Sequence, residues 1–257
     1  MAKVTLTGKI LGAVAEGTTG ANGTPFKKFI VAVITGGGNN PRVAGEQKTS
    51  YFGVMTFGKL AEAAYQAGQT VVVDGEMEVT EFQVTPSKPA NQAVVVSAKR
   101  VEIVPGDRRH YAHTYNVLGN LVLEHPDHYA PKTEGAKAVI TQKVAVSKYV
   151  GEKEYTSFYR IVFFGDRGQK LADKGLLDKG RVKSVLVDGS IRAEYSPDKN
   201  DPSKRWLNVD ILVDDFQIAC WRNVGQKTPG EPEVVIEKAP AAPELPEIDI
   251  DEEDIPF

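Results

Sequence analysis

Short runs in which polar and apolar residues alternate recur along the chain and predict strands. Successive side chains of a strand point to opposite faces, so a period of two is typical of a half-buried strand. The N-terminal sequence MAKVTLTGKILGAV shows this period, and later runs are rich in β-branched residues and bounded by glycine or proline. Two stretches, 58–68 and 165–175, interrupt the strands and predict short helices. The pattern predicts a mostly β fold.

The strand pattern occurs twice because the chain contains an internal repeat. Residues 49–58 read TSYFGVMTFG and residues 156–165 read TSFYRIVFFG, so four of ten positions are identical without a gap. VVVDGEMEV at 71–79 pairs with VLVDGSIRA at 185–193 in the same way. Two long copies with loops of different length indicate two homologous domains, because a solenoid needs more and shorter repeats.

Each copy has the same predicted order of elements: three strands, a short helix and two further strands. Five strands with one helix between the third and the fourth are typical of the OB fold, a small, partly open barrel around an apolar core. The second, third and last strands are expected at 27–34, 49–57 and 92–104, and at 138–148, 155–164 and 206–218. We expect two tandem five-stranded OB barrels at 1–105 and 114–224, a linker at 106–113 and a tail at 225–257.

Charge is divided unequally between the barrels and the tail. The whole chain has 31 basic and 34 acidic residues, a net charge of −3. The tail contains ten of the acids and two of the basic residues and therefore carries −8, which leaves +5 on residues 1–224. A basic body with an acidic tail indicates polyanion binding and a separate interaction segment. The proline-rich tail has no amphipathic period, so we expect it to be disordered.

The third strand of each copy brings aromatic and basic side chains to one face. Phe158, Arg160 and Phe164 share one parity in the second copy. Arginine is rarely buried without a partner, so we expect this face to point outward. The corresponding outward residues of the first copy are Tyr51, Met55 and Phe57.

Outward rings beside basic side chains predict a binding face for single-stranded nucleic acid. Nucleobases stack on aromatic rings whatever their identity, at about 1–3 kcal/mol each, and lysines or arginines neutralise the phosphates. The alternative is that individual rings belong to the cores and that the lysines are only solvated. The predicted DNA-binding residues are Lys28, Tyr51, Met55, Phe57, Lys59, Phe82, Lys143, Tyr149, Phe158, Arg160, Phe164, Arg167 and Trp206.

The third strand and the segment after it resemble one known family. TSYFGVMTFGKLAE at 49–62 and VVVDGEM at 71–77 are similar to the corresponding segments of bacterial single-stranded DNA-binding proteins. The resemblance implies that the aromatic residues Tyr51, Phe57 and Phe82 stack on DNA. In the second copy the corresponding residues are Phe158, Phe164 and Ser196.

The last residues of the sequence resemble the same family more closely. Residues 249–257 read DIDEEDIPF, and members of the family end in acids followed by Ile or Leu, Pro and Phe. The resemblance implies a tip that docks into apolar, basic-rimmed pockets on replication and repair proteins. Phe257 would supply the apolar anchor and a carboxylate, and the acids would steer it to basic rims. The predicted partner-binding residues are Asp251, Glu252, Glu253, Asp254, Ile255, Pro256 and Phe257.

Other motifs do not favour catalysis. Residues 53–59 fit G-x-x-x-x-G-K, but Leu60 stands where a phosphate-binding loop needs Ser or Thr for magnesium. Two H-x-x-H pairs have no cysteine or acidic cluster at metal-ligand spacing; they are formed by His110 with His113 and by His125 with His128. We therefore expect no enzymatic activity, no metal and no cofactor.

The sequence thus predicts a sequence-tolerant binder that protects single-stranded DNA in replication, recombination and repair and recruits partner proteins through its tip. The main alternative is an OB-fold protein that binds RNA or serves in assembly, and a further one is an enzyme that uses the histidine pairs. A single cysteine and the lack of about 20 consecutive apolar residues favour a soluble, cytoplasmic, nucleoid-associated protein. In the resembled family, two barrels per chain imply a homodimer with four barrels.

Overall fold

The computed structural model describes residues 2–19, 23–35, 48–83, 91–106, 108–130, 137–197 and 205–222. The chain divides into two units at Val224, and all the described residues belong to the first unit. The tail 225–257 lies outside the described residues, so its disorder stays a prediction.

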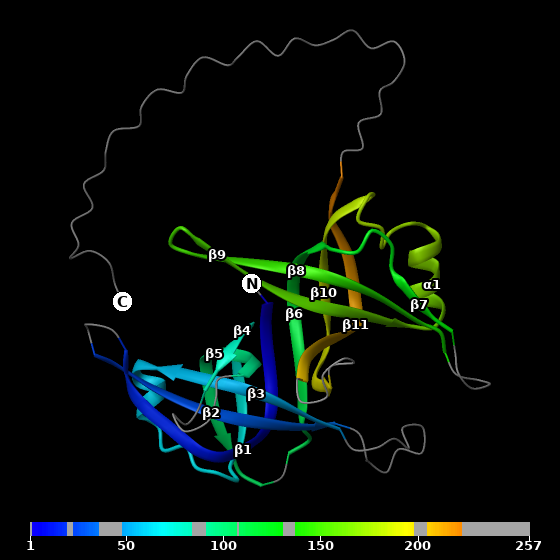
Figure 1. Ribbon diagram of the computed structural model, residues 1–257. Coiled ribbons are helices and arrows are strands. Elements are labelled where there is room, and N and C mark those ends of the chain that lie inside the picture. Colours follow the sequence, from blue (N-terminus) through cyan, green and yellow to red (C-terminus); the bar gives the residue numbers. More distant parts are fainter. Residues whose placement is uncertain are drawn as a thin grey trace, which may run out of the picture. The chain divides into compact units, whose positions relative to one another are not determined.

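The first barrel consists of five strands, namely β1 (Ala2–Thr19), β2 (Thr24–Thr35), β3 (Lys48–Phe57), β4 (Thr70–Phe82) and β5 (Asn91–Val104). β1 pairs with both β2 and β4, and β3 joins β2 to β5, which closes the ring (Figure 1). Alternate side chains such as Phe29, Phe52 and Val73 are fully buried inside it. This closed arrangement is the predicted OB barrel.

The second barrel repeats this arrangement with β6 (Tyr111–Leu121), β8 (Val139–Val150), β9 (Lys153–Phe164), β10 (Val182–Pro197) and β11 (Arg205–Trp221). β6 pairs with β8 and β10, and β9 joins β8 to β11 (Figure 1). An additional strand, β7 (Asp127–Tyr129), pairs with β8 outside the ring. Three residues are too few to show a period, so β7 was not predicted.

Both predicted helices are present but shorter than expected. In the first barrel a 3-10 helix, η2 (Gly58–Glu62), ends where the backbone of Ala63 becomes extended. The chain then turns so that Tyr65 packs on Phe29, with 4.9 Å between ring centres. In the second barrel the helix is α1 (Asp166–Asp173). No helix among the described residues is long and apolar enough to cross a bilayer.

The V-D-G segment of each repeat marks a bulge in the fourth strand. The register of β4 with β5 shifts between Asp74 and Gly75, and that of β10 with β11 shifts between Asp188 and Gly189. A Cβ atom at either glycine would collide with a carbonyl oxygen of the neighbouring strand. Glycine is therefore required where the strand bends to close the barrel.

The two barrels share one continuous sheet. β1 pairs antiparallel with β6, with Val4 opposite Thr114, and the Thr114 hydroxyl donates to the carbonyl of Lys3 at 2.7 Å. β6 therefore begins at Tyr111, inside the stretch expected to be a linker, because β1 supplies its hydrogen-bonding partner.

The contact between the barrels is reciprocal. Ser50 of β3 accepts a hydrogen bond from the backbone N–H of Ala193 at 3.0 Å. Ser157 of β9 accepts one from the backbone N–H of Val79 at 2.9 Å. The two serines occupy equivalent repeat positions, as do Val79 and Ala193. Each third strand is thus bound to the fourth strand of the other barrel.

Candidate nucleic-acid interface

The third strand of each barrel exposes two rings on its outward face. In β9, Phe158 and Phe164 are 52% and 50% exposed, and Tyr159, Ile161 and Phe163 of the opposite parity are buried. In β3, Tyr51 and Phe57 are 45% and 37% exposed. The predicted alternation is present in both strands. It does not expose every outward position, because Val162 between Arg160 and Phe164 is only 5% exposed.

The first barrel adds a third ring to this face. Phe82, the last residue of β4, lies over the backbone of Gly53 in the middle of β3. A Cβ atom built at Gly53 would come within 2.9 Å of three ring carbons, so only glycine leaves room for the ring. Tyr51, Phe82 and Phe57 therefore follow one another along the outward face. Successive nucleobases can stack on such a row.

A lysine from the second strand stands beside the rings of each barrel. Lys28 of β2 has its Nζ 5.1 Å from the ring centre of Phe26. Lys143 of β8 has its Nζ 5.9 Å from the ring centre of Phe158. These distances lie within the range of a cation–π contact, which is about 6 Å. In the strand register Lys28 is opposite Met55 and Lys143 is opposite Arg160, so both positive charges can neutralise the phosphates of a stacked strand.

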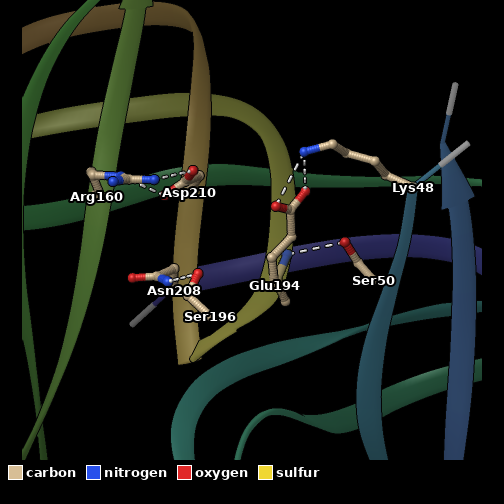
Figure 2. A network of polar contacts seen from close by, with 8 residues as sticks. Lys48, Ser50, Arg160, Glu194, Ser196, Asn208 and Asp210 are labelled. Atoms are coloured by element: carbon tan, nitrogen blue, oxygen red, sulfur yellow. Dashed lines mark hydrogen bonds and ion pairs between the residues drawn. The ribbon is translucent and has the colours of Figure 1, made fainter. Parts of the chain in front are cut away.

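The centre of the second face is polar instead of aromatic (Figure 2). The Arg160 guanidinium donates from Nε and Nη2 to the two carboxylate oxygens of Asp210, at 2.7 and 2.6 Å. These hydrogen bonds raise the pKa of Arg160 above its ordinary value. Asn208 Nδ2 donates to Ser196 Oγ at 2.9 Å on the neighbouring pair of strands. The predicted phosphate-binding role of Arg160 therefore competes with an existing ion pair.

The remaining predicted residues are distributed around the two faces. Met55 is half-buried opposite Lys28, and Lys59 is exposed in η2 directly after Phe57. Tyr149 and Trp206 are exposed near the ends of β8 and β11. Arg167 at the start of α1 donates to the carbonyl oxygen of Asp214 at 2.5 Å and lies 3.5 Å from the carboxylate of Asp215, so it too is held by β11.

Two aromatic residues on these faces, Phe26 and Tyr129, were not among the DNA-binding residues predicted from the sequence. Phe26 stands directly opposite Phe57 in the β2–β3 register, and its shared parity with Lys28 could have indicated it. Tyr129 stands in β7 opposite Val139, which in turn faces Phe164, so it shares the outward face of the second barrel. It could not be found from periodicity, because β7 has only three residues.

The side chains on the two faces are suited to stacking of bases and neutralisation of phosphates. Rings, lysines and polar groups line the faces, among them the Arg160–Asp210 ion pair. His113 and His125, one from each predicted pair, lie 3.0 and 3.2 Å from carboxylate oxygens of Asp214 and Asp178. Within the described part of the chain, no group of three or more His, Cys, Asp or Glu side chains could hold a metal ion. The predicted partner-binding residues 251–257 lie outside the described residues.

Comparison with known proteins shows what this arrangement is similar to. Residues 1–104 match the Single-strand binding protein family. Two crystal structures of the single-stranded DNA binding protein from Thermus aquaticus, a deletion mutant and the wild type, are similar to this chain with TM-scores of 0.56 and 0.55. Each is 19% identical and covers 85% of this chain, and the likeness extends over 94% and 92% of those chains.

At this level of identity the structural likeness establishes a common fold, which spans both barrels. No curated protein matches the chain. The first barrel is therefore similar to the Single-strand binding protein family over residues 1–104, and the second barrel has the same strand arrangement as the first.

Proposed function

We propose that this chain binds single-stranded DNA with little sequence preference, through the outward faces of β3 and β9. The observation that carries the proposal is the repetition of exposed rings at the same two positions of both third strands, each face with a lysine beside it. The family match of residues 1–104 supports it. Such a protein would protect exposed strands in the cytoplasm during replication, recombination and repair, without catalysis.

Binding of poly(dT) over a series of salt concentrations tests the proposal. Affinity should fall steeply as salt rises, because bound phosphates release counterions, and it should change little among other homopolymers. A structured RNA should compete poorly. If poly(dT) does not bind at low salt, or if the structured RNA binds more tightly, an RNA-binding or assembly role would replace this proposal.

The rings are tested by replacing one in each barrel. Phe57→Ala together with Phe164→Ala should weaken binding at least about 30-fold, because each stacking contact contributes about 1–3 kcal/mol. The fold should be retained because both rings are outside the cores. Trp221→Ala removes an exposed ring from the end of β11 and serves as a control with unchanged affinity. Equal affinities for the double variant and the control would rule out these rings as the platform.

We propose further that the segment Asp251–Phe257 recruits replication and repair proteins. Its acids and the apolar Ile255 and Phe257 match a basic-rimmed apolar pocket. Deletion of residues 254–257 should abolish partner binding and preserve DNA binding or tighten it slightly, since the acidic tail competes with phosphates for the basic body. A large loss of DNA affinity in this variant would contradict the proposal.

Two copies of the chain would form a homodimer that presents four barrels. Leu118 and Tyr115 of β6 are exposed although β6 lies inside the joined sheet, between β1 and β10. A groove of about 360 Å³, lined in part by Lys3, Asp74 and Tyr115, opens on the same region. Leu118→Glu should convert the dimer to a monomer in sedimentation equilibrium, and a dimer that survives this change would place the contact elsewhere.

A further inference from the structure

The two barrels differ at the centre of their outward faces. Gly53 of β3 and Arg160 of β9 occupy the same position of the repeat, and so do Phe82 of β4 and Ser196 of β10. In the first barrel the glycine leaves room for the Phe82 ring. In the second barrel an arginine side chain stands at the glycine position, and a serine stands where the ring would be. The central stacking ring of the first face is therefore missing from the second.

The charges at this polar centre are already paired. Arg160 and Asp210 are neighbours in the parallel β9–β11 register and form a bidentate ion pair, which is the strongest geometry for these groups. The Arg160 side chain is 44% exposed and that of Asp210 is 20% exposed, so the pair lies at the surface. Close by, Glu194 of β10 holds Lys48 of β3 at 3.0 Å (Figure 2). Each third strand thus has a cation whose charge is compensated by an acid of the second barrel.

We propose that Asp210 restrains Arg160 and thereby makes the second barrel the weaker of the two DNA-binding faces. The proposal rests on the function proposed above and assigns unequal parts of it to the two barrels. Arg160 donates from Nε and Nη2 to the carboxylate of Asp210. The negative charge of Asp210 therefore weakens the attraction of Arg160 for a phosphate. The second barrel then has Ser196 at the position of the Phe82 ring, and the charge of Arg160 is paired, so Phe158, Phe164 and Lys143 remain for DNA. A bound strand would detach from this barrel while the first still holds it.

Asp210→Asn in the full chain tests the restraint directly. Asparagine has the same shape and still accepts one hydrogen bond, but its neutral amide no longer compensates Arg160. Binding of a dT oligomer at moderate salt should tighten about five-fold, the factor that corresponds to about 1 kcal/mol. The plot of log affinity against log salt should become steeper by about 0.7, the value for one additional phosphate contact on a single strand.

Glu124→Gln is the matched control. It also removes one negative charge and releases a basic residue, because Glu124 pairs with Lys179 at 3.0 Å. These two residues lie in the segments after β6 and before β10, outside the outward faces of β3 and β9. The control should leave both the affinity and the salt dependence close to those of the unmodified chain.

A second variant gives the second barrel the residues of the first. It combines Arg160→Gly, Ser196→Phe and Asp210→Val, since Val95 of β5 holds the position of Asp210 in the parallel pair of the first barrel. Binding should tighten because a ring is added, and the salt dependence should stay the same because one charge of each sign is removed. The reverse change, Phe82→Ser, should weaken binding.

The results separate this proposal from the proposed function. The restraint of Arg160 would be overturned if the folded Asp210→Asn variant binds no tighter than the Glu124→Gln control. It would also be overturned if the three-residue variant binds no tighter than the unmodified chain. An unmodified chain that fails to bind the dT oligomer would overturn the proposed function itself.

Discussion

Gly53 shows how one residue without a side chain can shape a binding face. Its outward position in β3 matches that of the rings at Tyr51 and Phe57, yet it contributes no ring of its own. It instead makes room for Phe82, which arrives from the end of β4. The Phe82 ring is thereby held in a row between the rings of Tyr51 and Phe57. Because its position is already restricted, stacking on a base has a smaller entropic cost.

Replacing Gly53 by alanine should therefore impair DNA binding more than folding. The new methyl group would stand 2.9 Å from the Phe82 ring, which must move, whereas the backbone can stay in place because the ring belongs to a movable side chain. Loss of part of one stacking contact predicts about five-fold weaker binding of dT oligomers. Gly180→Ala, at a position with open space around it, is the control. Equal binding by both variants would show that the Phe82 ring does not stack on DNA.

At the residue scale, the sequence predicted the direction of side chains that depends on a local pattern. The period of two places Phe158 and Phe164 outward because neighbouring residues of the same strand set the parity. It could not reveal the bond between Arg160 and Asp210, which are 50 positions apart and meet only through the parallel β9–β11 register. An exposed arginine on an outward strand looks the same in the sequence whether or not an acid from another strand faces it.

At the scale of elements, each third strand is fixed by the opposite barrel. Ser50 and Ser157 supply acceptors for backbone N–H groups of β10 and β4. The same two strands carry the rings, so these bonds link the position of one face to the core of the other barrel. The early start of β6 escaped prediction because it depends on β1, which is distant in sequence, and β7 escaped it because three residues show no period.

Removal of either serine hydroxyl should destabilise the joined barrels. Ser50→Ala leaves the buried N–H of Ala193 without its acceptor, and this predicts a loss of about 1–3 kcal/mol in the free energy of unfolding. Ser157→Ala should cost less, because Val79 is only half-buried. Urea denaturation measures both. Ser147→Ala, whose hydroxyl meets Thr156 on the exposed hairpin, should change stability by no more than about 0.5 kcal/mol; the same small change for Ser50→Ala would contradict the role given to it.

At the scale of the whole molecule, the sequence repeat predicted two barrels but did not predict that they share one sheet. Two homologous domains on a linker and two domains joined through β1 and β6 have the same sequence pattern. The joining depends on the register of Lys3 to Thr7 with Tyr111 to Tyr115. A core residue takes part in it as well, because Tyr159 of the second barrel donates its hydroxyl proton to the carbonyl oxygen of Met77 in the first, at 3.4 Å.

Because of Tyr159, we expect the joined barrels to lose stability in alkaline solution. Burial raises the pKa of its hydroxyl well above the ordinary value. Its contribution is therefore complete below pH about 10, where the unfolded chain also keeps the proton, and declines as pH rises, because the unfolded chain then ionises while the folded one does not. The decline should approach about 1.4 kcal/mol per pH unit.

Tyr159→Phe should remove this part of the decline. At pH 8 the variant should be less stable by about 1 kcal/mol, since it loses the hydrogen bond to Met77. Between pH 10 and 11 its free energy of unfolding should fall less steeply than that of the unmodified chain, because phenylalanine has no proton to lose in the unfolded state. Urea denaturation at each pH supplies both numbers. Parallel curves above pH 10 would show that Tyr159 ionises as readily in the folded barrels as in the unfolded chain.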